Sequence, residues 1–75
     1  MKKLLNTLFV TTEDAYLSLD GENVVISKDR HELARFPLHT LSGIIAFTYA
    51  GASPALMGGC VERGVSLSFC SPSGR

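Results

Sequence analysis

A serine stands where some hydrolases place their nucleophile. The segment GASPA, residues 51–55, lies between an apolar run and a stretch that is typical of a helix. In enzymes with such a strand-to-helix corner, the acid and the histidine base follow the serine in the chain. No histidine or aspartate follows Ser53, because His31 and His39 both lie upstream. Ser53 is therefore predicted to cap a helix, and a serine hydrolase built on it stays open as an alternative.

The glycines around this serine suggest a phosphate-binding loop as a second kind of chemistry. A Walker loop carries Gly-Lys-Ser or Gly-Lys-Thr after its glycines, because the lysine must reach the phosphates. The segment GASPALMGG, residues 51–59, contains no lysine, and Pro54 has no N–H to donate. The Gly-x-Gly-x-x-Gly spacing of dinucleotide sites is missing as well. The sequence therefore predicts no phosphate cradle, and only a generic anion suits the helix dipole at this corner.

Acidic and histidine side chains form two short pairs, His31-Glu32 and Glu13-Asp14. No third ligand is spaced to complete a metal site with either pair. We expect these residues to be solvated turn residues. From the residues alone, the chain is predicted to carry neither catalytic nor metal-binding side chains.

The charge balance argues against a chain that binds nucleic acid by itself. Seven basic and seven acidic residues cancel over 75 residues, and the basic ones are scattered. A domain that binds DNA without a partner usually has an excess of basic residues or a row of them on one face. The composition, 45% hydrophobic and 19% charged, is globular. A domain of this size has a thin core and often completes its burial against a partner, which is a first indication of oligomerisation.

The N-terminal stretch MKKLLNTLFV is similar to a secretory signal, but Asn6 and Thr7 interrupt its apolar run. No segment approaches the roughly 20 apolar residues that cross a bilayer. We expect a cytoplasmic chain without membrane contact. Cys60 and Cys70 fit no metal spacing, and two intracellular cysteines are typically small buried hydrophobes.

The first half of the chain is typical of an antiparallel meander of short strands. Polar turns separate the apolar or alternating segments, and the signal is strongest at Asp20-Gly21-Glu22-Asn23, since glycine takes the positive φ of a tight hairpin. Pro37 ends the last of these strands because it has no N–H for the ladder. The predicted strands are residues 4–10, 15–19, 23–27 and 31–36.

One β-α-β crossover is predicted to follow the meander. The apolar run at residues 44–49 is typical of a covered strand. A helix is expected from Ser53 to about Arg63, with proline in its first turn and Gly64 at its left-handed end. Residues 65–69 alternate as a return strand, which a short crossover places parallel to the first. The fold class is therefore α+β, mostly β.

The predicted helix has no charged side chain from Ala55 to Val61, nearly two full turns. An exposed helix would show a polar stripe opposite its apolar one. We therefore expect burial on two sides, one against the chain's own sheet and one against another molecule. The alternative is a small helix sunk in its own core. The candidate interface residues are Ala55, Met57, Gly58, Val61 and Tyr49.

Three stretches of the chain resemble one known family. They are MKKLLNTLFVTTEDAYLSLDGENVVI, RFPLHTLSGIIAF and YAGASPALMGGCVERGVSLSFCSPSGR, and together they span nearly all 75 residues. They resemble the start of the CRISPR-associated integrase of spacer acquisition, in its type I-C branch. A stand-alone interaction module of unrelated origin remains the other interpretation.

The resemblance implies a metal-dependent DNA endonuclease and integrase that inserts foreign DNA into the CRISPR array in antiviral defence. Members use Mg²⁺ or Mn²⁺ and act as homodimers with the second-numbered CRISPR-associated protein on double-stranded DNA. Their N-terminal β domain forms the dimer, and their catalytic residues belong to a C-terminal helical domain. Residues 1–75 are thus expected to be the dimerisation domain alone, an N-terminal fragment that is inactive as a nuclease. None of the family's catalytic residues maps onto Glu13, His31, His39 or Glu62.

Overall fold

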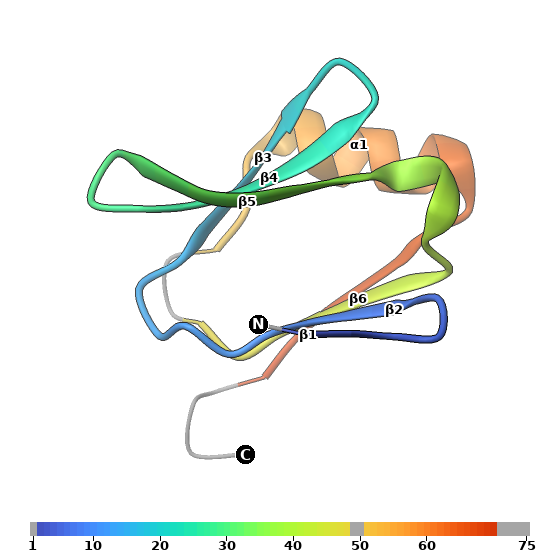
Figure 1. Cartoon of the computed structure of the whole chain (residues 1–75). Helices are drawn as coiled ribbons and strands as arrows, with labels where there is room; N and C mark the ends of the chain where they lie inside the picture. The colour runs from blue at the N-terminus through green and yellow to red at the C-terminus, as the bar shows by residue number, and fades with distance from the viewer. Residues whose placement is uncertain (1, 49–50, 71–75) are drawn as a thin grey trace.

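The computed structural model describes residues 2–48 and 51–70, which form two sheets and one helix (Figure 1). One sheet has the strand order β1-β2-β6-β7, and the other is the three-stranded sheet β3-β4-β5. The mostly-β fold class and the single crossover predicted from the sequence are confirmed. The elements are β1 (Lys2–Leu4), β2 (Thr7–Val10), β3 (Tyr16–Asp20), β4 (Asn23–Lys28), β5 (His31–Pro37), the 3₁₀ turn η1 (Leu38–Thr40), β6 (Gly43–Ala46), α1 (Pro54–Arg63) and β7 (Ser66–Phe69).

The three-stranded sheet is the predicted meander, with both of its neighbouring pairs antiparallel. Gly21 takes a φ of 62° in the turn between β3 and β4. The turn between β4 and β5 has no glycine, and Asp29 and Arg30 take φ values of 52° and 65° there. On β5, the register shift between Ile26 and Ser27 leaves Leu33 as an extra residue, a β-bulge.

The first predicted strand, residues 4–10, is wrong in detail, because it divides into two strands. Leu5 turns the chain with a φ of 56°, and β1 pairs antiparallel with β2. A leucine gives no turn signal, since non-glycine residues rarely adopt that conformation. β2 then leaves the meander and pairs parallel with β6, where the carbonyl of Asn6 accepts the N–H of Ser42 at 2.7 Å.

The strand predicted at residues 44–49 is shorter than expected and ends at Ala46. The N–H of Phe47 still donates to Val10 at 2.8 Å, but the chain then turns away from the sheet. The buried hydroxyl of Thr48 donates to the carbonyl of Ala15 at 2.7 Å and ties this exit to the start of β3.

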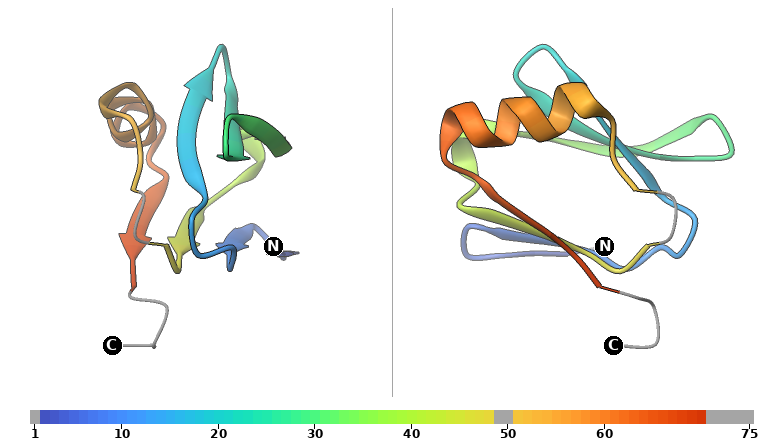
Figure 2. Two further views of the ribbon diagram at one scale, coloured as in Figure 1. Left: turned by 90° about the vertical axis from the view of Figure 1, so that its left-hand side faces the viewer. Right: turned by 180° about the vertical axis from the view of Figure 1, so that it is seen from behind.

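The core lies between the two sheets, and α1 closes one open side of it. Figure 2 shows α1 alongside the three-stranded sheet and next to β7. Leu56 and Cys60 face inward from the helix and belong to the same buried cluster as the strands. The fully buried large side chains are Leu8, Val10, Leu17, Val24, Ile26, Leu38, Ile44, Leu56 and Cys60.

Local signals define both ends of α1. The Oγ of Ser53 accepts the N–H of Leu56 at 3.1 Å, and Pro54 occupies the first turn. At the other end Gly64 takes a φ of 68°, and the N–H of Val65 donates to the carbonyl of Cys60 at 2.9 Å. This is a left-handed helix termination of the kind that glycine favours.

The two glycines inside α1 differ in what surrounds them, and this difference yields a prediction. A Cβ on Gly58 would meet nothing within 4 Å, whereas one on Gly59 would lie 3.2 Å from a methyl of Leu19. Since glycine costs about 1 kcal/mol in a helix interior, Gly58→Ala should raise the free energy of unfolding by about that amount. Gly59→Ala should gain less or lose stability. Urea titration at low protein concentration measures both, and equal gains would contradict the packing described.

Candidate functional site

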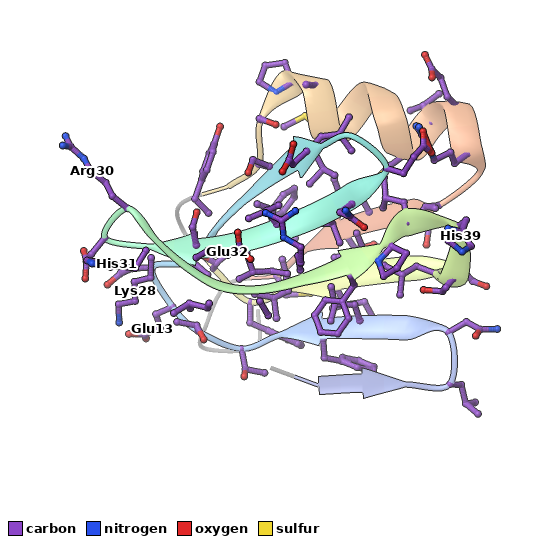
Figure 3. The ribbon with its side chains drawn as sticks, turned by 45° about the horizontal axis from the view of Figure 1, so that its top comes forward. Glu13, Lys28, Arg30, His31, Glu32 and His39 are labelled. Atoms are coloured by element: carbon purple, nitrogen blue, oxygen red, sulfur yellow. The ribbon has the colours of Figure 1, made fainter. Side chains whose placement is uncertain are left out.

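The hydroxyl of Ser53 serves the helix and not a catalytic group. It accepts the N–H of Leu56, and its backbone N–H donates to the carbonyl of Leu17 at 2.8 Å. Figure 3 shows His31 at the tip of the β4–β5 hairpin and His39, within η1, at the opposite end. The Nδ1 of His31 lies 2.9 Å from the carbonyl oxygen of Asp29. The hydrogen bonds of Ser53 thus belong to the start of the helix, and neither histidine is among its partners there.

Charged side chains gather at one end of the molecule without forming a metal site. Figure 3 shows Glu13, Lys28, Arg30 and His31 at this end, with acidic and basic groups mixed. Across residues 2–48 and 51–70, no three His, Cys, Asp or Glu side chains are placed to hold a metal ion. The residues present thus do not fit the Mg²⁺ or Mn²⁺ that the sequence resemblance implies.

The helix presents a largely apolar surface to solvent. Leu56, Gly59 and Cys60 are buried beneath it. The side facing away from the core carries Ala55, Met57, Gly58 and Val61, which we call the outer helix face. Val61 is 81% exposed and Met57 is 44% exposed. The hypothesis of a helix sunk in its own core is therefore wrong, because only one side of α1 packs against this chain.

Four of the five predicted interface residues share the outer helix face. Tyr49 lies outside the described residues. The exposed side chain of Glu62 lies on the same side of α1, one turn after Gly58. Met57 and Val61 are the large apolar side chains of α1 that lie exposed to solvent.

Two sets of contacts fix α1 against the three-stranded sheet. At its start, Leu17 donates its N–H to the carbonyl of Gly51 at 3.1 Å and accepts from Ser53. At its end, the guanidinium of Arg63 donates to both carboxylate oxygens of Glu22, at 2.7 and 2.8 Å. This hydrogen bonding, together with the positive charge of Arg63, holds the pKa of Glu22 below its usual value. The outer helix face is therefore presented by a helix that is anchored at both ends.

The thiol of Cys60 does not contribute chemistry to this surface. It is buried on the inner side of α1, and that burial raises its pKa. A buried thiol with a raised pKa is a small hydrophobe, as the sequence predicted. Cys70, expected to be similar, is only half-buried.

Sequence reasoning did not locate the edge at β7. This strand is outermost in its sheet among the described strands, and Phe69 is 43% exposed on it. Its sequence, SLSF, has no charge, proline or bulge of the kind that usually protects an edge. No local feature of this sequence distinguishes it from a central strand, because the edge position follows from the strand order.

None of the helices among the described residues has the length and apolar character needed to cross a bilayer.

Comparison with known proteins identifies one family repeatedly. The family model described as "CRISPR associated protein Cas1" matches residues 8–75. The chain is 53% identical over 75 residues to "CRISPR-associated endonuclease Cas1 1" of Chlorobaculum tepidum. It is 43% identical over 75 residues to "CRISPR-associated endonuclease Cas1 2" of Rhodospirillum rubrum. Each alignment covers 100% of this chain and 22% of the relative, so the chain spans about a fifth of the length of these proteins.

Two solved structures share the fold at low sequence identity. A chain of a "Partial Cas6-RT-Cas1--Cas2 complex" superposes with a TM-score of 0.82 at 14% identity, covering 92% of this chain and 21% of that one. A "Casposase bound to integration product" gives a TM-score of 0.62 at 16% identity, covering 88% of this chain and 21% of that one.

The contact between Glu22 and Arg63 predicts how stability depends on pH. Because the pKa of Glu22 is lowered in the folded chain, its contribution is present above the unfolded-state pKa and is lost as the pH falls through the folded value. Glu22→Gln should therefore destabilise the chain at pH 7, and the difference from the unchanged chain should disappear well below pH 4.5, the ordinary value. Urea titration at several pH values measures this. Glu13→Gln, an exposed carboxylate in the turn before β3, is the control, and an equal effect there would contradict the assignment.

Proposed function

The chain belongs to the Cas1 family, and on that premise we propose that it is the N-terminal region of a CRISPR-associated DNA endonuclease and integrase, with the joining of subunits as its own task. The single observation that supports this task is the exposure of Met57 and Val61 on the outer helix face. The family match over residues 8–75 sets aside an interaction module of unrelated origin.

DNA cleavage and integration would be carried out by parts of the longer protein outside these residues. Curated relatives are named as endonucleases, which supports DNA cleavage by the whole protein. A relative of this fold is in a complex with Cas2, which suggests that partner here as well. Mg²⁺ or Mn²⁺ dependence, double-stranded DNA, spacer insertion, a cytoplasmic location and the type I-C branch are proposed on the sequence resemblance. Any metal would be held by residues beyond those described, since none of these form a site.

Subunit joining fits the electrostatics of the region. A protein surface that holds DNA by its phosphates needs clustered lysines and arginines. In this chain Arg35 is paired with Asp20 and Glu32, and Arg63 is paired with Glu22. These two arginines are already paired within the chain and are therefore less available to phosphates.

The exposed apolar side chains supply a driving force for association. Fully burying a valine or methionine side chain is worth about 1.5–3 kcal/mol. A specific interface buries about 800 Å² on each partner, which is roughly a fifth of the 4475 Å² that this chain exposes. A ten-residue helix is only about 15 Å long, so its outer face supplies part of that area. The isolated region is therefore expected to dimerise weakly.

A charge on the outer helix face should prevent association. Val61→Glu should weaken dimerisation at least about tenfold, because a two-fold contact brings the new carboxylate against its own copy. Leu33→Glu is the matched control, since Leu33 is 45% exposed on the bulge of β5, away from the helix. Sedimentation equilibrium measures both. An unchanged chain that stays monomeric up to about millimolar concentration would contradict the proposed task, and equal effects of the two variants would contradict this face.

The region alone should lack nuclease activity. With Mn²⁺ or Mg²⁺ and double-stranded DNA, residues 1–75 should give no cleavage, because no described side chains assemble a metal site. The full-length Chlorobaculum tepidum relative is the positive control under the same conditions. Metal-dependent cleavage that follows the purified 75-residue chain through successive columns would contradict the assignment of chemistry to another part of the protein.

A further inference from the structure

The tip of the β4–β5 hairpin has a backbone conformation that its sequence does not favour. Lys28 pairs with His31 across a two-residue turn, and both central residues, Asp29 and Arg30, have a positive φ. Such turns favour Asn-Gly or Asp-Gly, because glycine takes a positive φ without steric cost. Asp29 fits this pattern, but an arginine in the second place is unfavourable. The conformation of the turn therefore does not explain why Arg30 is there.

Contacts within the chain do not explain Arg30 either. Its side chain is exposed, and Figure 3 shows it extending away from the body of the molecule. The ion pairs between described side chains engage Arg35 and Arg63 but neither Arg30 nor Lys28. Among the described arginines, Arg30 is thus the one whose guanidinium is unpaired. A residue in an unfavourable conformation that makes no such contact in its own chain points to a function outside it.

Three groups that can carry positive charge surround this turn. Lys28 and His31 are cross-strand partners, so their Cβ atoms lie roughly 5 Å apart on one face of the hairpin. The Nδ1 of His31 lies 2.9 Å from the carbonyl oxygen of Asp29, and since a carbonyl only accepts, Nδ1 carries the proton. This contact holds the imidazole ring at the tip and leaves Nε2 available to a ligand. Figure 1 shows the hairpin projecting past the rest of the chain, where a long polymer can reach its tip.

We propose that the tip of the β4–β5 hairpin binds the phosphate backbone of double-stranded DNA in the full-length protein, with Arg30 and Lys28 as the contacting groups. This inference rests on the proposed function as a DNA endonuclease and integrase, and it specifies one contact to that substrate. Guanidinium and ammonium groups bind phosphate oxygens through charge-assisted hydrogen bonds. A contact of this kind positions the duplex and reads no base sequence.

The acidic side chains at this end of the molecule limit the contact to a short stretch of the backbone. Glu32 is already held by Arg35 at 2.7 Å. Asp29 stands within the turn and Glu13 lies at the same end, so they offset part of the positive charge. The hairpin tip is therefore an accessory contact and not a surface that holds DNA by itself, in agreement with the balanced charge of the chain. Duplex DNA suits it because phosphates repeat along the whole polymer, whereas an acidic protein would need carboxylates matched to the tip.

Arg30→Gly separates the fold from the contact, because it should strengthen one and weaken the other. The substitution supplies the Asp-Gly turn that this hairpin favours, so the chain should unfold at higher urea concentration. In the full-length protein that contains these residues, the same change should weaken binding to a DNA duplex. The slope of log affinity against log salt should become shallower by roughly 0.9 for the lost phosphate contact, so the ratio of the two dissociation constants should grow roughly eightfold from about 1 M to about 0.1 M salt.

Fluorescence anisotropy with a labelled duplex, repeated at several salt concentrations, measures this slope. Lys28→Gln should make it shallower by a similar amount, and the double variant by about twice as much. Arg35→Gln is the matched control, since Arg35 is an exposed arginine that already pairs with Asp20 and Glu32. Its slope should equal that of the unchanged protein. Because Arg30→Gly is expected to stabilise the fold, weaker binding by that variant is not ascribed to unfolding.

Two results distinguish the contact from the proposed function. If the full-length protein binds and cleaves DNA but Arg30→Gly and Lys28→Gln keep the full salt slope, the hairpin contact is overturned while the proposed function stands. If the full-length protein neither binds nor cleaves DNA, both fall.

Three further results would also count against the hairpin contact. An equal loss with Arg35→Gln would assign the effect to net charge alone and overturn the contact. Variants at the tip that weaken binding to Cas2 but not to DNA would assign the tip to a protein partner and overturn it as well. A lower urea midpoint for Arg30→Gly would contradict the unfavourable turn from which the inference starts.

Discussion

The structure depends on one constraint: a single ten-residue helix must close the open side between two small sheets. Neither sheet can bury its inner face alone, because a domain of this size buries only a small hydrophobic core. The helix meets this demand with Leu56, Gly59 and Cys60, and it is anchored to β3 at its start and to the β3–β4 turn at its end. Its opposite side contributes nothing to this core. The exposure of Met57 and Val61 there is therefore not explained by the fold of this chain.

Local features were the part of the structure that the sequence could predict. Ser53, Pro54 and Gly64 determine the ends of α1 through contacts within a few residues, so the helix agreed with expectation. The hairpin at Gly21 was also predicted from a local feature, the positive φ that glycine adopts in a tight turn. Leu5 shows where this reasoning fails, since its positive φ is imposed by the pairing of β1 with β2 and of β2 with β6. Parallel pairing between segments more than thirty residues apart leaves no local signal.

The candidate surface, like the fold, was predictable only in part from the sequence. Seven successive residues without charge predicted a helix with two buried sides, but the structure buries only one, and Ala55, Met57, Gly58 and Val61 lie together on the exposed side. What the sequence could not separate was the meaning of its two adjacent glycines. Only the packing shows that Gly59 faces Leu19 while Gly58 faces open space. Likewise, the edge position of β7 follows from strand order, which composition does not encode.

Intermolecular nuclear Overhauser effects test the central claim most directly. In a mixed sample of isotope-labelled and unlabelled chain at high concentration, isotope-filtered spectra report only contacts between copies. The account predicts cross-peaks between the methyl groups of Val61 and Met57 in one copy and those in the other. Cross-peaks that connect Leu67 and Phe69 of the two copies instead, with none at the outer helix face, would contradict it.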